Sequence, residues 1–357
     1  MVIFMNKKLY ADKGFLNYDY IFEMSDKHNC PYIMIVGGRG VGKTYGALKY
    51  LYEHDINYMF MRRTQTQLDM ISKNEVMPYA ALNQRIGSDI STFKISKYIT
   101  GFYHTINEDK GKLKPSGEPI AICCALSTIS NLRGFDASRY NQLLLYDEFI
   151  PERHERPIKE EGNAFLNAIE TIARNKEIEG DKPMKVLCLA NANNISNPIF
   201  LKLKLVNIAD NMIRKGEEIR FIENKGVMLI MLHDSPISKQ KADTSLYKLS
   251  HDTDFEDMAL HNNFAALSHD VIAHKNLKEY RLIVSIGEIA IYKHKSRTEY
   301  YVSSHVSGSA PVYELSETSL RTFRIEYNYI WIQYCISHVL FESYTLQVLF
   351  EKYYKKC

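Results

Sequence analysis

The sequence has 357 residues, 45% of them hydrophobic and 24% charged, with only 17 glycines and 10 prolines. That is long enough for about two globular domains, and the composition excludes a disordered or collagen-like chain. Its 45 basic and 42 acidic residues leave a net charge of +3, so contact with nucleic acid would need local basic patches. Apolar stretches reach about seven residues, against the ~18 to 20 that span a bilayer. Met1–Lys8 is too short for a signal peptide, and we expect a soluble protein with no membrane partner.

Up to about residue 200, short apolar runs alternate with polar or helix-length stretches. Runs that are apolar throughout predict buried strands of a parallel sheet with helices on both faces. The spacing of apolar residues in Asn163–Ala173 predicts a helix. The expected strands are Tyr32–Val36, Asn57–Met61, Tyr98–Thr105, Pro119–Leu126, Gln142–Tyr146 and Lys185–Ala190.

The pattern changes after residue 200. Ile199–Glu223 is charged with helical spacing and is interpreted as a connector, while Ser235–His274 is polar and expected to be partly helical or mobile. Ser316–Tyr354 predicts one or two aromatic-rich helices. We therefore expect a first domain at 1–200, a helical linker at 201–226 and a second domain at 227–357. The second domain should hold a largely antiparallel sheet with strands in Val227–Leu232, Tyr280–His294, Tyr300–His305 and Pro311–Leu315.

The cysteines form neither a CxxC pair nor a zinc-site spacing. We interpret them as reduced thiols in a reducing compartment, several of them filling the core. The six are Cys30, Cys123, Cys124, Cys188, Cys335 and Cys357.

A phosphate-binding loop is predicted between the first strand and a helix at Tyr45–Tyr52. The pattern G-x-x-x-x-G-K-[ST] is met without a mismatch by Gly37, Gly38, Arg39, Gly40, Val41, Gly42, Lys43 and Thr44. Its backbone amides, at a helix N-terminus, would surround phosphates. We expect Lys43 to reach the β- and γ-phosphates of ATP and Thr44 to hold Mg²⁺. Arg39 is either a phosphate contact or a solvated side chain.

A second acidic motif ends the strand that includes Leu143–Tyr146. Asp147 and Glu148 follow this apolar run directly. In P-loop ATPases the Asp at this place orients the Mg²⁺ water shell, and the adjacent Glu is placed to activate the attacking water. The pair favours an ATPase over a GTPase or a kinase acting on a small molecule.

Two further residues have alternative interpretations. Asn191, at the end of the strand Val186–Ala190, is either a group that holds the lytic water and senses the γ-phosphate or a turn-forming Asn. Arg174, at the end of the helix before that strand, is either an arginine finger or a cation that complements the helix dipole. By itself the second reading of Arg174 is favoured.

Together these motifs resemble the terminase-like DNA-packaging ATPases of small tailed bacteriophages. The nearest branch is the one whose motor works with a packaging RNA on the procapsid. The resemblance covers nearly the whole chain. It is carried by the phosphate loop, Met61-Arg62-Arg63, Leu143–Glu148, Glu170–Lys176, and Leu189–Ala192 through Asn197-Pro198.

The resemblance implies a specific fold and function. The fold is an α/β P-loop ATPase domain, with a parallel sheet and helices on both faces, followed by a smaller α+β RNase H-like domain that lacks catalytic acids. The function is ATP-driven movement of double-stranded DNA through a portal into a preformed procapsid by a homo-oligomeric ring, of five subunits in that family. The cofactors implied are ATP and Mg²⁺. The location implied is the host cytoplasm, transiently on the procapsid.

The resemblance also assigns roles to residues. Lys43 and Thr44 bind nucleotide and Mg²⁺, Asp147 holds the metal and Glu148 is the catalytic base. Arg174 falls where the family keeps an arginine finger that enters the neighbouring subunit's site, which reverses the single-residue interpretation.

DNA contacts are expected from a few basic residues. By resemblance, Arg153 falls in a pore-facing DNA loop and Arg133 lies near a second pore-loop position. The stretch Asn107–Gly117 reads as an exposed turn between strands, and it adds Lys110, Lys112 and Lys114. A motor that acts on any sequence should hold backbone phosphates rather than base edges.

An active nuclease is the alternative for the second domain. Two-metal nucleases need converging acidic residues, including one Asp in the first core strand. That strand, within Arg281–His294, offers only Glu288, and the acids of Asp252–Asp257 fall in an expected loop. We therefore expect the nuclease fold without its activity. A terminase with an active nuclease, and a non-motor P-loop protein such as a switch or kinase, remain as competing hypotheses.

Overall fold

The computed structural model describes residues 8–11, 14–107, 113–132, 134–152, 155–156, 158–192, 195–232, 236–237, 244–250 and 271–355. The chain forms two units, Met1–Leu203 with Asn211–Ala265, and Lys204–Asp210 with Ala266–Cys357. None of the helices within the described ranges is long and apolar enough to cross a bilayer. The described cysteines are free thiols, and four of the five are buried.

The first unit is built on a nine-stranded sheet in the order β3-β4-β5-β2-β6-β7-β1-β9-β8. Its six central strands, from β5 to β9, pair in parallel. The outer strands β3, β4 and β8 pair antiparallel. The bounds are β1 Tyr32–Gly37, β2 Tyr58–Arg62, β3 Ile90–Lys94, β4 Thr100–Asn107, β5 Leu113–Ala125, β6 Leu143–Asp147, β7 Lys185–Asn191, β8 Ile219–Ile222 and β9 Val227–Met231.

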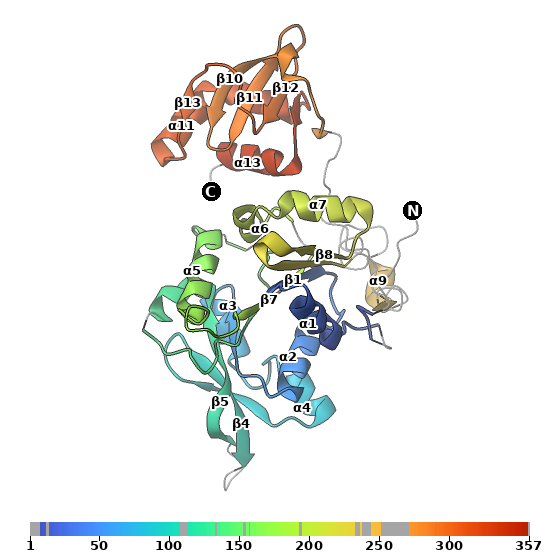
Figure 1. Ribbon diagram of the computed structural model, residues 1–357, viewed down its shortest axis with the longest axis vertical. Coiled ribbons are helices and arrows are strands. Elements are labelled where there is room, and N and C mark those ends of the chain that lie inside the picture. Colours follow the sequence, from blue (N-terminus) through green and yellow to red (C-terminus); the bar gives the residue numbers. More distant parts are fainter. Residues whose placement is uncertain are drawn as a thin grey trace. The chain divides into compact units, whose positions relative to one another are not determined.

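Helices cover both faces of this sheet (Figure 1). Apolar residues of α1, α2 and α4 pack with alternate strand residues into one large core cluster. On the opposite face, Phe165 of α5 packs on Tyr146 of β6, and Phe200 of α6 packs on Phe149. This is the two-sided α/β layering that the apolar runs predicted. The helices are α1 Tyr18–Lys27, α2 Lys43–Glu53, α3 Gln65–Ile71, α4 Ala80–Ile86, α5 Glu161–Ala173, α6 Pro198–Leu203, α7 Val206–Lys215 and α9 Ser245–Leu249, with the 3-10 turns η1 Leu126–Leu132 and η2 Glu223–Lys225.

The boundary predicted between the domains is wrong at two strands. β9 lies in the first sheet, parallel to β1 in the register Tyr32↔Val227, and not in the second sheet. β8 pairs with β9, although its residues were assigned to a helical linker. Within the predicted helical connector, α6 and α7 are helical as expected. An apolar run of five residues fits either sheet, and its partner strand decides where it belongs.

The second unit has a five-stranded sheet in the order β13-β10-β11-β12-β14. The strands β10, β11 and β12 form an antiparallel meander, while β13 and β14 pair in parallel. Three helices pack on one face through an aromatic-rich cluster, where one or two were predicted. The bounds are β10 Tyr280–Ile286, β11 Ile289–His294, β12 Tyr300–Ser303, β13 Val312–Tyr313, β14 Val339–Phe341, η4 Leu277–Glu279, α11 Glu317–Glu326, α12 Asn328–Cys335 and α13 Tyr344–Tyr354.

Candidate active site

The phosphate loop joins β1 to α2, as predicted. Gly37 admits no side chain, because an added Cβ would lie 2.6 Å from Cβ of Leu232. Gly42, just before α2, has a left-handed backbone with φ of +83°, a conformation that glycine adopts without strain. The hydroxyl of Tyr18 donates to the backbone oxygen of Lys43 at 2.5 Å. These contacts hold the loop against the N-terminus of α2, where backbone amides favour an anion.

Lys43 lies buried inside this loop. Its Nζ donates to the backbone oxygens of Gly37 at 2.9 Å and Gly38 at 2.6 Å. It also donates to Oδ1 of Asn191, at the end of β7, at 3.2 Å. β1 and β7 are parallel neighbours with Gly37 opposite Asn191, which explains the contact. The structure therefore places Asn191 beside the lysine expected to bind phosphates.

Asp147 ends β6 beside the loop, and its carboxylate is buried. Its Oδ1 accepts a hydrogen bond from the Thr44 hydroxyl at 2.9 Å. Its Oδ2 lies 3.1 Å from Nη2 of Arg62 but takes part in no hydrogen bond among the described residues. A hydroxyl and a carboxylate are the ligand types that Mg²⁺ takes beside substrate phosphates. The residues present thus fit a magnesium ion.

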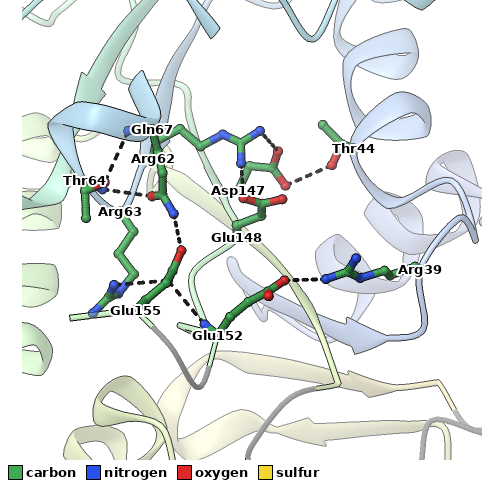
Figure 2. Close-up of polar contacts among 10 residues, drawn as sticks. All are labelled: Arg39, Thr44, Arg62, Arg63, Thr64, Gln67, Asp147, Glu148, Glu152 and Glu155. Carbon is green, nitrogen blue, oxygen red and sulfur yellow. Dashed lines mark hydrogen bonds and ion pairs between the residues drawn. The ribbon is translucent and has the colours of Figure 1, made fainter. Parts of the chain in front are cut away.

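Glu148 follows Asp147 with an unusual backbone. Its φ is +57°, in the left-handed region that non-glycine residues seldom occupy and that is often found at active sites. Its side chain is 51% exposed and lies 2.5 Å from Nη1 of Arg62. Desolvation raises the pKa of the Glu148 carboxyl; Arg62 opposes the rise, and Asp147 adds to it. Figure 2 shows the Arg62 guanidinium between the two carboxylates.

Two more arginines hold the segment that follows Glu148 (Figure 2). Arg39, in the phosphate loop, forms an ion pair with Glu152, a partner that the sequence analysis did not identify. Arg63 is fully buried, and its Nη1 lies 3.2 Å from Oε2 of Glu155. Its Nε donates to Oε1 of Glu161 at 2.6 Å. Burial would lower the pKa of the Arg63 guanidinium, but its contacts with Glu161 and Glu155 outweigh this effect and raise it.

A cavity of about 490 Å³ connects these groups. It brings together residues that the sequence predicted for nucleotide and metal binding: the loop, Asp147, Glu148 and Asn191. The pocket lies at the C-terminal edge of the parallel strands, where α/β sheets bind ligands. The lining residues are Arg39, Gly40, Gly42, Lys43, Thr44, Tyr45, Asp147, Glu148, Glu152, Ala190 and Asn191.

Arg174 does not line this cavity. It caps the C-terminus of α5 with φ of +53° and ψ of −139°. Its Nη2 donates to the backbone oxygen of Phe135 at 2.6 Å, and Nη1 lies 3.9 Å from Asp136. The guanidinium is about half exposed.

Five basic residues are expected to contact DNA, and one of them, Lys114, lies within the described ranges. Arg133, Arg153, Lys110 and Lys112 lie outside the described residues. Lys114 is exposed near the start of β5, opposite Ile106 of β4. The two strands form the expected hairpin, which extends away from the sheet in Figure 1.

The second unit offers no counterpart to this site within the described part of the chain. No group of three or more His, Cys, Asp or Glu side chains is arranged there, or in the described first unit, to hold a metal ion. Glu288 is exposed between β10 and β11, and the acids of Asp252–Asp257 lie outside the described residues.

The sequence did not assign roles to Arg62 and Arg63. A signal was present, because two consecutive arginines end a strand that pairs in parallel with β6, the strand of Asp147. Successive residues of a strand point to opposite sides, and the two guanidiniums indeed serve different carboxylates. Their acidic partners could not be identified without the fold.

Comparison with known proteins places the chain in a family. The curated DNA packaging protein of Bacillus phage PZA is 26% identical over 291 residues, which cover 79% of this chain and 74% of that protein.

Two solved structures share the fold over nearly the whole chain. The Phi-28 gp11 DNA packaging motor superposes with a TM-score of 0.63 at 19% identity, covering 97% of this chain and 99% of that one. The bacteriophage Phi-29 viral genome packaging motor assembly gives 0.61 at 16% identity, with coverage of 95% and 98%. The family model of the podovirus DNA encapsidation protein (Gp16) matches residues 12–304. This chain therefore belongs to the podovirus DNA encapsidation (Gp16) family, which confirms the resemblance predicted from its motifs.

Proposed function

We propose that this chain is a subunit of an ATP-hydrolysing motor that translocates double-stranded DNA into a preformed procapsid. One arrangement carries the proposal: an intact phosphate loop and the Asp147–Glu148 pair line the same cavity. That combination supports Mg²⁺-dependent ATP hydrolysis. Membership in a DNA encapsidation family, with relatives described as DNA packaging proteins, supports DNA as the cargo.

Nucleotide binding would rest on the loop. Its amides and Lys43 would take the phosphates, with Lys43 exchanging its contacts to the Gly37 and Gly38 oxygens for phosphate oxygens. Thr44 and Asp147 would hold Mg²⁺, which neutralises charge on the phosphates and orients them. The existing hydrogen bond between these two residues brings both ligands to one point.

Hydrolysis would use Glu148 as the general base. Desolvation raises the pKa of its carboxyl, which makes the carboxylate a stronger base than that of an ordinary glutamate. Arg62, in contact with both carboxylates, would orient Glu148. Asn191, within 3.2 Å of Lys43, would hold the attacking water or sense the γ-phosphate.

Assembly would complete the site. We propose a homo-oligomeric ring, of five subunits, in which Arg174 enters the neighbouring subunit's site as an arginine finger. The Arg174 guanidinium lies outside the cavity of its own subunit, which supports a role in trans. The relatives described as a packaging motor and a motor assembly support a ring at the portal of the procapsid. By the same reasoning a packaging RNA is a partner, and the motor works in the host cytoplasm, transiently on the procapsid.

DNA would be gripped through phosphates by few basic residues, with Arg153 first and Arg133, Lys110, Lys112 and Lys114 next. Because the net charge of the chain is only +3, binding would depend on these local contacts with phosphates. Such contacts should weaken steeply with salt and barely depend on DNA sequence. The second unit would be an RNase H-like domain that contacts nucleic acid or the portal and does not cleave DNA.

The test is ATP hydrolysis with and without double-stranded DNA. We expect DNA to stimulate hydrolysis, Glu148→Gln to reduce it by about 10²- to 10⁴-fold with ATP binding retained, and Lys43→Ala to weaken binding itself. Glu288→Gln is the matched control, because it makes the same carboxylate-to-carboxamide change at an exposed position of the second unit. Turnover retained by Glu148→Gln would remove the proposed base, and nicking of plasmid DNA with Mn²⁺ would revive the nuclease alternative.

A further inference from the structure

Helix α5 runs from a contact with Arg63 at its start to the proposed arginine finger, Arg174, at its end. Its first residue, Glu161, contacts Arg63, which follows the Arg62 that contacts Asp147 and Glu148, and its last turn leads into Arg174. With 13 residues, the helix separates these two ends by about 20 Å. A displacement of the first turn would therefore be carried to Arg174 by a rigid element.

Glu161 is a charged residue in a buried position, where a carboxylate needs a partner. It shares the buried face of α5 with Phe165, Ala168 and Ile172, and it is only 2% exposed. Arg63 compensates its charge with a fork of two hydrogen bonds, Nε to Oε1 at 2.6 Å and Nη2 to Oε2 at 3.0 Å. Such a fork fixes direction as well as distance.

The start of α5 has one side-chain hydrogen bond of its own, from Nδ2 of Asn163 to Oε2 of Glu160 at 2.7 Å. The residue at the N-cap, Glu160, has a left-handed backbone with φ of +53° and makes no capping hydrogen bond to the helix. Gly162 packs so closely on α6 that an added Cβ would lie 2.5 Å from Cβ of Lys202. That hydrogen bond is local to the helix start, whereas the close packing on α6 and the ion pair with Arg63 tie the first turn to other elements.

At the other end of α5, the C-cap residue Arg174 has a strained backbone and a side chain fixed by a hydrogen bond. Arg174 has a φ and ψ combination that glycine adopts readily and other residues rarely. Its guanidinium is held by the backbone oxygen of Phe135. An arginine finger acts on the charge of a transition state and must be placed accurately, since an error of about 1 Å can cost ~10²-fold in rate.

We propose that Glu161, clamped by the buried Arg63, is a positioning residue for Arg174. The clamp ties the first turn of α5 to β2, the strand whose Arg62 contacts Asp147 and Glu148. Each subunit thereby aligns the finger it gives to its neighbour against its own nucleotide site. The inference rests on the proposed action of Arg174 in trans.

The test uses rings mixed from two inactive parents, assembled with DNA and procapsids. Arg174→Ala subunits supply intact sites, and Glu148→Gln subunits supply intact fingers, so only mixed interfaces hydrolyse ATP. Glu161→Gln is then introduced into one parent at a time. Glu160→Gln is the matched control, because this neighbouring carboxylate bonds only Asn163 among the contacts described for it. Glu161→Asp, which keeps the charge but shortens the reach, is tested in the same way.

We expect Glu161→Gln in the finger-giving parent to lower the restored hydrolysis by roughly 10- to 100-fold. In the site-giving parent it should change the rate less than about twofold, and Glu160→Gln should do so in either parent. Equal losses in both parents, or none in either, would overturn the positioning role, and urea unfolding of each variant reports any common loss of stability. If the unmodified parents restore no hydrolysis, Arg174 does not act in trans and the proposal fails with it.

Discussion

Arg63→Met should be one of the most destabilising substitutions in the first unit. The change leaves Glu161, which is 2% exposed, as a buried carboxylate without its counter-charge. Removing one partner of a buried ion pair costs about 3–5 kcal/mol. For a unit of this size, that corresponds to a fall of roughly 6–20 °C in the midpoint of thermal unfolding.

A second substitution should recover most of this loss. In Arg63→Met with Glu161→Leu no charge is left stranded at the helix start, and Glu155 keeps its hydrogen bond of 2.7 Å from Gln67. Apolar replacement of a whole buried pair is often neutral or stabilising. Urea unfolding followed by far-UV circular dichroism gives both free energies. The single tryptophan, Trp331, lies in the second unit, so its fluorescence is an internal control. A loss under about 1 kcal/mol for Arg63→Met, or no recovery in the double variant, would refute the reasoning.

Three further predictions concern the nucleotide site. Because desolvation raises the pKa of Glu148 from its usual 4.5, and only the ionised form can act as a base, hydrolysis should fall with decreasing pH before an ordinary glutamate would titrate. A rate that is flat through that range, in protein still folded by circular dichroism, would contradict this. Thr44→Ala removes the hydroxyl bonded to Asp147, so it should raise the Mg²⁺ concentration needed for half-maximal hydrolysis, whereas Thr44→Ser should not. Gly37→Ala forces a Cβ to 2.6 Å from Leu232 and should cost about 1–3 kcal/mol in unfolding free energy; unchanged stability would show that the loop can move away.

The nucleotide site was largely predictable because its chemistry is local in the sequence. Eight consecutive residues supply the loop, and the strand before it was placed at Tyr32–Val36 against the observed Tyr32–Gly37. Asp147 and Glu148 are adjacent, and the apolar run Leu143–Tyr146 directly before them predicts the strand that Asp147 ends. A parallel sheet then brings such strand ends to one edge without further information.

The remaining contacts depend on distant parts of the chain. Arg62 and Arg63 were visible as residues, but Glu155 and Glu161 are identified only when β2 and the start of α5 meet. The assignment of Val227–Leu232 to the second sheet failed for the same reason. Its apolar pattern predicts a strand, and only the pairing with β1 shows which sheet it completes.

The pairing of β9 with β1 has a consequence for how this protein is made. The strand that carries the phosphate loop lacks one neighbour until residues 227–231 have left the ribosome, and Leu232, which packs on Gly37, arrives with them. Until then one backbone edge of β1 is open, and an open edge is a template for pairing with another chain. Products of premature termination between residues 200 and 226 should therefore aggregate rather than accumulate as small active ATPases. We therefore expect nascent chains to acquire the proposed nucleotide binding only late in synthesis, after most of the first unit has been translated.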